Sequence, residues 1–161
     1  MREQLPIVIF VERYSDMVVE LPTMVAEYKT LENLLTDVVS HNNKTLVQKK
    51  LHLVKDGIES PHLAKLAYTY SIVSKILSQY DFNAVTYRMI MPNTCYNWHV
   101  DPGKLCLHIP LVSNIGCRFV YDTRAFNMPA DGSVYTVNNE RPHTFVNAGS
   151  EPRVHLTFEN L

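Results

Sequence analysis

Residues 105–121 read LCLHIPLVSNIGCRFVY, and this stretch decides the fold class. It contains two short apolar runs, residues 105–112 and 117–121, which are typical of strands and are separated by the turn signal Asn114-Ile115-Gly116. The same pattern continues on both sides. Evenly spaced short strands of this kind predict an antiparallel β-barrel or sandwich over residues 83–161. The further strands are predicted at residues 84–91, 134–137, 144–147 and 153–158, with turns at residues 91–93, 101–103, 130–132 and 148–150.

Residues 1–82 have a different pattern, which is mostly helical. Apolar residues recur at helical spacing over residues 31–39 and, more regularly, over residues 63–77. The second helix has a start signal, because Ser60 offers an N-cap hydroxyl and Pro61 suits the first helical position, and its end is predicted near residues 79–80. Residues 7–11 are predicted to be a short strand, while residues 46–54 fit either structure. We expect the helices to pack outside the β part, so that residues 1–161 form one domain.

Composition excludes several classes of protein. The 161 residues are 46% hydrophobic and 19% charged, which is typical of a globular domain and not of a disordered chain. Fifteen Lys and Arg against sixteen Asp and Glu give a net charge of −1, so no nucleic-acid partner is expected. The early apolar run, residues 6–11, is far shorter than the roughly 20 residues of a membrane span and lacks a secretory cleavage pattern.

The three cysteines, Cys95, Cys106 and Cys117, contain no C-x-x-C pair. An odd number without that spacing argues against a disulfide framework and against a cysteine zinc site. We therefore expect a reducing, cytoplasmic location.

A candidate metal site begins with His99 and Asp101. Residues i and i+2 of a strand project from one face, so this imidazole and this carboxylate can converge on one ion. The spacing of these two residues alone favours a hydrogen-bonded pair at a strand end. His143, on a later predicted strand, supplies a third ligand. Two histidines and one carboxylate leave open coordination positions, which suits Fe(II) used with O₂ and an organic co-substrate, although three protein ligands and a water also suit zinc.

Arg153 favours iron, because alternation over residues 152–158 places it with His155 and Thr157 on one face of a strand. If that face lines the barrel, a charged guanidinium there requires an anion, and a dicarboxylate co-substrate would be that anion. His108 interrupts an otherwise apolar strand. It is either a second donor to the carboxylate or a core histidine bonded to a backbone carbonyl.

Residues 84–159 resemble the 2-oxoglutarate- and Fe(II)-dependent dioxygenases, specifically the aspartyl/asparaginyl β-hydroxylase group, which includes bacterial free-proline hydroxylases. Order, spacing and context all agree. The resembling segments are residues 98–102 (WHVDP), 107–114 (LHIPLVSN), 142–149 (PHTFVNAG) and 153–156 (RVHL).

The resemblance implies a fold that is mainly β, a double-stranded β-helix of the jelly-roll or cupin type, with the N-terminal helices packed on its outside. It also implies His99, Asp101 and His143 as iron ligands and Arg153 as the partner of the 2-oxoglutarate 5-carboxylate. His108 matches a family histidine that contacts the co-substrate, and Arg88 occupies a position from which its side chain can reach it.

Two positions bear on where this chain stands within the family. One differs from the usual family residue, and the other differs between members of the family. Cys106 stands where the family often has a basic residue, so anchoring of the co-substrate is expected to depend more on Arg153. Asp101 keeps a metal-binding carboxylate that animal members lack. In this respect the chain is more similar to the bacterial small-molecule hydroxylases.

The expected function is therefore hydroxylation of an amino acid, free or within a peptide, using Fe(II), 2-oxoglutarate and O₂ and releasing succinate and CO₂. Two alternatives remain open at this point, a non-catalytic β-barrel module that binds a metal and a carboxylate, and a cupin-like zinc hydrolase. Neither a nucleic acid nor a membrane is expected as a partner. Tyr96 and Trp98 either shape a substrate pocket or only pack beside the site, while His155 is expected to be structural.

Overall fold

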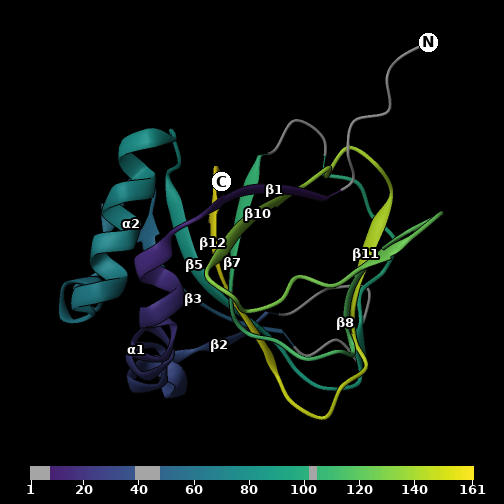
Figure 1. Ribbon diagram of the computed structural model, residues 1–161, viewed down its shortest axis with the longest axis horizontal. Helices are drawn as coiled ribbons and strands as arrows, with labels where there is room; N and C mark the ends of the chain where they lie inside the picture. The colour runs from purple at the N-terminus through teal and green to yellow at the C-terminus, as the bar shows by residue number, and fades with distance from the viewer. Residues whose placement is uncertain (1–7, 39–47, 102–104) are drawn as a thin grey trace.

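Two antiparallel sheets face each other in the computed structural model, which describes residues 8–38, 48–101 and 105–161 (Figure 1). The larger sheet follows the order β1 (Val8–Arg13), β10 (Ser133–Val137), β7 (Cys106–Val112), β12 (Arg153–Glu159), β5 (Ala84–Ile90), β3 (Gln48–Lys55) and β2 (Thr36–Val38), with β4 (Ile58–Glu59) paired to β3. The smaller sheet follows the order β6 (Thr94–Cys95), β11 (His143–Asn147), β8 (Cys117–Tyr121) and β9 (Ala125–Phe126).

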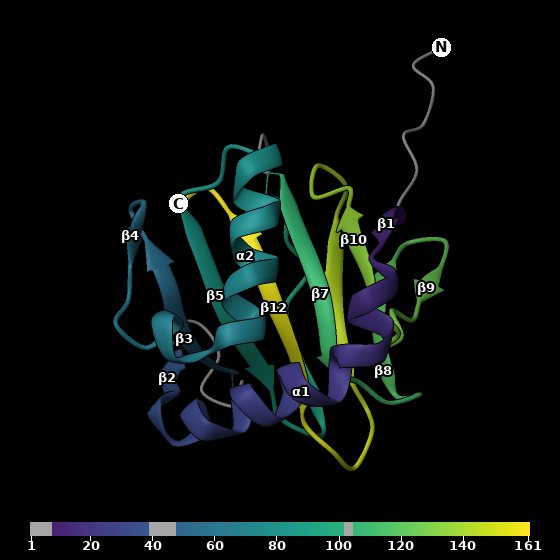
Figure 2. The same ribbon diagram turned by 60° about the vertical axis from the view of Figure 1, so that its left-hand side comes forward.

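Helices α1 (Ser15–Leu31) and α2 (Ala67–Gln79) cover the outer face of the larger sheet (Figures 1 and 2). The sheet presents apolar side chains to them, because residues of one parity in each strand point to one face. In β12 these are Val154, Leu156 and Phe158, all buried in the same apolar cluster as residues of both helices. Burial of each such side chain stabilises the fold by about 1.5–3 kcal/mol. The helices thus bury the outer face of the sheet, and the inner face can line a binding site.

The inner face meets the smaller sheet through a second apolar cluster. Phe119 of β8 and Phe145 of β11 pack edge to face there, with ring centroids 5.0 Å apart, and Ile90 of β5 contributes from the larger sheet. This cluster joins the two sheets. The inward residues of β12 are polar, and Arg153, His155 and Thr157 among them are buried.

The strands predicted after residue 82 are confirmed, since β5, β7, β8, β10, β11 and β12 each begin and end within one residue of the predicted bounds. The ambiguous stretch is a strand, β3, and the early strand is β1. Residues 7, 39, 46, 47, 102 and 103 of these predictions lie outside the described residues.

The helix predicted over residues 31–39 is wrong. Leu31 is the last residue of α1, a short 3₁₀ helix follows at Glu32–Leu34, and β2 begins at Thr36. The real helix lies earlier, and its buried residues Met17, Met24, Tyr28 and Leu31 form a sparse stripe, with exposed apolar residues such as Val18 and Val19 between them. That sparse stripe hides the helical period in the sequence.

The second predicted helix ends at Gln79 as expected but begins later than predicted. The Ser60 hydroxyl accepts a hydrogen bond from the His62 backbone at 3.2 Å, and a 3₁₀ helix at Leu63–Lys65 precedes α2. The Ser60-Pro61 signal therefore starts this 3₁₀ segment and not the α-helix itself.

Glu27 of α1 caps the start of α2 in place of a local side chain. Its carboxylate accepts hydrogen bonds from the backbone N–H groups of Tyr68 (3.1 Å) and Thr69 (2.9 Å) and from the Thr69 hydroxyl (2.9 Å). The first N–H groups of a helix have no partner within it, and the N-cap residue Leu66 supplies no side-chain bond. One carboxylate thus satisfies the helix end and fixes the two helices against each other.

Substitution of Glu27 by Ala is predicted to lower the free energy of unfolding by about 2–3 kcal/mol, because two backbone donors and a buried hydroxyl lose a charged acceptor. Glu27→Gln should cost less, since the amide oxygen still accepts. Urea unfolding measures both. Glu20→Ala is the control, because in the described part of the chain the Glu20 carboxylate accepts a hydrogen bond only from Thr23, one turn away. A loss below about 0.5 kcal/mol for Glu27→Ala would contradict the capping role.

Candidate active site

His99, Asp101 and His143 meet at one point of the barrel, as the sequence predicts. Backbone hydrogen bonds of 3.0 Å in both directions pair His99 with His143 at the start of β11, and the two rings lie 4.3 Å apart between centroids. The Asp101 Oδ2 atom lies 3.5 Å from Nε2 of His99 and 3.8 Å from Nε2 of His143. One donor atom from each residue lies within 4.8 Å of the others. Such a group can hold one metal ion.

Backbone carbonyls orient both imidazoles. The Nδ1 atom of His99 lies 2.8 Å from the carbonyl oxygen of Asn97, and that of His143 lies 2.8 Å from the carbonyl oxygen of Arg141. A carbonyl oxygen only accepts, so Nδ1 is protonated in both rings, and in a neutral ring the lone pair is then on Nε2. Burial lowers the pKa of His143, which favours the neutral ring. These hydrogen bonds orient both rings with Nε2 directed at Asp101, the orientation that suits metal binding through Nε2.

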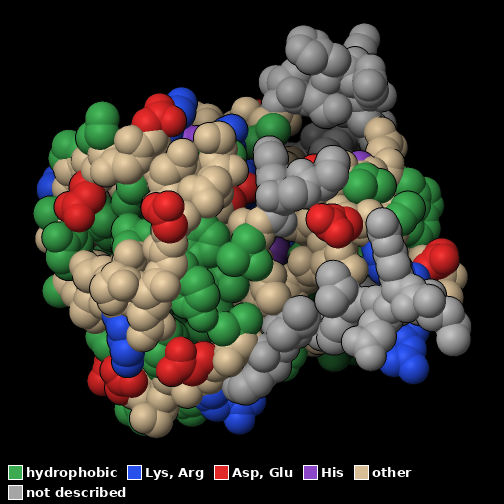
Figure 3. Space-filling model, turned by 90° about the horizontal axis from the view of Figure 1, so that it is seen from above, with side chains coloured by type: hydrophobic (Ala, Val, Ile, Leu, Met, Phe, Trp, Pro, Cys, Tyr) green, Lys and Arg blue, Asp and Glu red, His purple; other side chains and the backbone are tan. Residues whose placement is uncertain are grey.

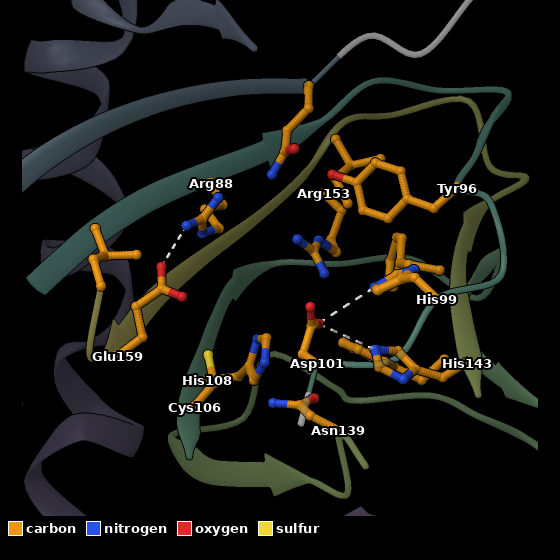
Figure 4. Close-up of a pocket in the computed structure, with 15 residues that line it drawn as sticks. Arg88, Tyr96, His99, Asp101, Cys106, His108, Asn139, His143, Arg153 and Glu159 are labelled. Carbon is orange, nitrogen blue, oxygen red and sulfur yellow. Dashed lines mark hydrogen bonds and ion pairs between the residues drawn. The ribbon is translucent and has the colours of Figure 1, made fainter. Parts of the chain in front are cut away.

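A cavity of about 340 Å³ lies beside these three residues (Figure 4). Its volume is within the range of small-molecule sites. Both sheets contribute to its wall, as does the segment between β6 and β7. It is lined by Gln48, Arg88, Ile90, Tyr96, His99, Asp101, Cys106, His108, Phe119, Asn139, His143, Phe145, Arg153, Glu159 and Leu161.

Arg153, the first residue of β12, lines this cavity as a buried cation. Only 3% of it is exposed, and its Nε atom has no hydrogen-bond partner among the described residues. The guanidinium carbon lies 4.1 Å from the centroid of the Phe145 ring. Burial lowers the pKa of Arg153 to about 10, which still leaves it charged at neutral pH. A buried charge without a carboxylate is costly, so this position calls for an anion from outside.

The Tyr96 hydroxyl is a second buried polar group that lacks a partner in the described part of the chain. It points toward Arg153 in the cavity (Figure 4). Burial raises the pKa of Tyr96 to about 12, so the hydroxyl keeps its proton and can donate it in a hydrogen bond. Trp98, by contrast, is 56% exposed and does not line the cavity.

His108 and His155 form a buried pair, with their Nδ1 atoms 3.2 Å apart. Burial, together with the Arg153 charge, lowers the pKa of His108 to about 3 and that of His155 well below its usual value. Both rings are therefore neutral, and one N–H bridges them. Of the two, His108 lines the cavity.

Arg88 lies in the cavity as predicted, but its guanidinium already has an internal partner. Its Nη2 atom forms an ion pair with Oε1 of Glu159, and the side chains are 21% and 14% exposed. Cys106 also lines the cavity, where burial raises the pKa of its thiol to about 12. The position where the resembling family often has a basic residue is therefore neutral.

Glu159, Gln48 and Asn139 line the cavity but were not singled out in the sequence. The alternation that places Arg153 inward also places Glu159 inward, so the sequence pattern alone could have predicted Glu159 in the cavity wall. Gln48 begins β3, which the sequence left ambiguous. Asn139 lies between β10 and β11, where no periodicity marks it.

Comparison with known protein families decides the classification. The model of the aspartyl/asparaginyl β-hydroxylase family matches residues 20–160. The chain belongs to this family. Its members are enzymes that use Fe(II) and 2-oxoglutarate, and the cluster of His99, Asp101 and His143 is consistent with an iron site. No curated protein gives a significant sequence match.

Solved structures share the fold of this β-hydroxylase family member at low sequence identity. A Pseudomonas putida prolyl-4-hydroxylase aligns with a TM-score of 0.56 and 14% identity, covering 89% of this chain and 88% of the other. An oxidoreductase of the 2OG-Fe(II) oxygenase family from Burkholderia pseudomallei has a TM-score of 0.52 and 14% identity, covering 84% and 77%. A predicted oxalate decarboxylase from Thermotoga maritima has a TM-score of 0.49 and 13% identity, covering 80% and 95%. The two likenesses with TM-scores above 0.5 confirm the predicted mainly β, double-stranded β-helix fold.

Asp101→Ala is predicted to weaken Fe(II) binding by about 100-fold or more, since it removes the only carboxylate of the cluster. Anaerobic calorimetric titration with Fe(II) measures the affinity. Asp37→Ala, at an exposed position of β2, serves as the matched control. Equal affinities in Asp101→Ala and the control would remove Asp101 from the set of ligands.

Proposed function

We propose that this chain hydroxylates an amino acid, free or within a peptide, with consumption of 2-oxoglutarate and O₂ and release of succinate and CO₂. The observation that carries the proposal is the position of the buried, unpaired Arg153 guanidinium in the same cavity as His99, Asp101 and His143. A set of three metal ligands alone suits many functions. The same set beside a buried cation suits a co-substrate that chelates the metal at one end and carries an anion at the other.

His99, Asp101 and His143 would hold Fe(II) through two imidazole nitrogens and one carboxylate oxygen, leaving positions for small ligands. Bound iron supplies the O₂-dependent oxidation of the co-substrate and of a C–H bond of the substrate. The backbone carbonyls of Asn97 and Arg141 keep the two imidazoles in the required tautomer before any metal arrives.

The chain's own residues would bind the co-substrate and exclude water. The Arg153 guanidinium pairs with the 5-carboxylate of 2-oxoglutarate, and its parallel N–H groups suit a bidentate contact. The neutral His108 ring and the Tyr96 hydroxyl lie within the same cavity as further donors. Phe119 and Phe145 form an apolar wall, which strengthens this charge pairing by keeping water away.

Succinate formation is the direct test. The anaerobically purified protein, supplied with Fe(II), 2-oxoglutarate and air, is expected to form succinate and to add 16 daltons to an amino acid or peptide in a screen. His99→Ala should form none. Metal-loaded protein that forms no succinate with any member of the screen would favour the binding module. Zinc as the tightly held metal, together with hydrolytic activity, would favour the zinc hydrolase.

Arg153→Met is predicted to change binding and stability in opposite directions. Loss of the guanidinium should weaken 2-oxoglutarate binding by about 100-fold while Fe(II) binding is retained. Removal of an uncompensated buried charge should raise the free energy of unfolding of the ligand-free protein by about 1–3 kcal/mol. Calorimetric titration and urea unfolding measure the two effects, with the exposed Arg124→Met as control. Lower stability together with unchanged 2-oxoglutarate affinity would make Arg153 a purely structural residue.

We also propose a reducing, cytoplasmic location, because all three cysteines are free thiols. Among the residues that the structure describes, no helix is long and apolar enough to cross a membrane. On the face shown in Figure 3, the visible Lys and Arg side chains are scattered among Asp and Glu and form no continuous basic surface.

A further inference from the structure

The cavity contains a second charged site, at some distance from the candidate metal ligands. Arg88 of β5 and Glu159 of β12 lie at one end of the view in Figure 4, while His99 and His143 lie at the other. Neither residue of the pair is needed for the roles proposed above. Both side chains are mostly buried, and each faces the cavity.

The Arg88–Glu159 pair has unused hydrogen-bonding capacity. Within the described residues, the guanidinium uses only Nη2 and the carboxylate uses only Oε1. A guanidinium carries five N–H donors and a carboxylate has two acceptor oxygens, so most of this capacity remains available. The pair therefore offers a cationic donor group and an anionic acceptor group next to each other.

The charges of the cavity restrict what this site can bind. The charged side chains that line it, among the described residues, are Arg88, Arg153, Asp101 and Glu159, which balance to zero. Fe(II) and doubly charged 2-oxoglutarate also balance each other. A further ligand therefore fits best if it has no net charge but carries two opposite charges.

We propose that Arg88 and Glu159 form the subsite for the charged backbone of a free α-amino acid, whose own side chain is uncharged. Arg88 binds the α-carboxylate and Glu159 binds the α-ammonium group, while the two residues remain paired with each other. This inference rests on the proposed function and makes it more specific. It selects a free amino acid over a residue within a peptide, because a peptide group carries neither charge.

Arg88 also suits this role better than it suits the co-substrate. Arg153 is the cation without a carboxylate partner, whereas Arg88 has one. An incoming dianion at Arg88 would meet the negative charge of Glu159, and this repulsion costs binding energy. A zwitterion at the same place meets an opposite charge at both of its ends.

The first test compares free and blocked amino acids as stimulators of succinate formation. The probes are the free L-amino acids with uncharged side chains, together with the N-acetyl and the amide derivative of each. At least one free amino acid should stimulate the Fe(II)-loaded protein. Each block should lower kcat/KM for that amino acid by about 10- to 100-fold, since it removes one charge-assisted contact.

The second test assigns each charge to its residue. Glu159→Gln should raise KM for the free amino acid by about 10- to 100-fold and abolish discrimination against the N-acetyl derivative. Arg88→Gln should raise KM similarly and abolish discrimination against the amide. In both variants KM for 2-oxoglutarate should change less than about twofold. The exposed Glu32→Gln and Arg124→Gln are the matched controls, and thermal unfolding of the variants and of Arg88→Gln/Glu159→Gln checks folding.

The outcomes separate this inference from the function on which it rests. Succinate formation that blocked amino acids or peptides stimulate equally well overturns the subsite and leaves the oxygenase standing. A larger KM for 2-oxoglutarate in Arg88→Gln, with that for the amino acid unchanged, assigns Arg88 to the co-substrate and also overturns it. If no succinate forms at all, the oxygenase proposal fails. Calorimetric titration of the Mn(II)-loaded protein with the same free amino acids then decides the subsite separately, and absence of binding overturns it.

Discussion

A buried guanidinium with no counter-ion among the described residues is the constraint on which the site depends. Arg153 is almost completely buried, and the nearest stabilising contact given by the structure is the face of the Phe145 ring. A cation–π contact returns only part of the hydration energy that a buried charge loses. The fold must therefore be stable enough to hold this charge in place before any anion arrives, and that stability has to come from elsewhere in the molecule.

The strand that carries Arg153 also shows where the stability comes from. Val154, Leu156 and Phe158 point outward into the apolar cluster shared with α1 and α2, while Arg153, His155 and Thr157 point inward. The outward residues of this strand thus stabilise the fold, while its inward residues face the candidate site. Because α1 and α2 pack on the outer face (Figure 2), the inner face can carry charged and polar groups. The N-terminal helices matter to the site even though neither of them lines the cavity.

Much of this arrangement can be predicted from the sequence, because it follows from short-range patterns. Alternation of apolar residues locates the strands, and the H-x-D spacing places His99 and Asp101 together once a strand is assumed. The position of α1 could not be predicted in this way, since exposed apolar residues such as Val18 and Val19 lie between its buried ones and only a short 3₁₀ helix separates it from β2. The pairing of Arg88 with Glu159 depends on the register between β5 and β12, which sets Arg88 opposite His155 and leaves its long side chain to reach Glu159. No local pattern contains that register.

The two arginines of the cavity show how partners distinguish residues of one type. Both are inward-facing and both belong to neighbouring strands, so neither sequence nor location separates their roles. Their surroundings do, because Arg88 faces a carboxylate and Arg153 faces an aromatic ring and a tyrosine hydroxyl. An unpaired cation attracts an anion strongly, whereas a paired cation attracts only a ligand that also satisfies its partner. The same residue type can therefore select a dianion at one end of the cavity and a neutral dipole at the other.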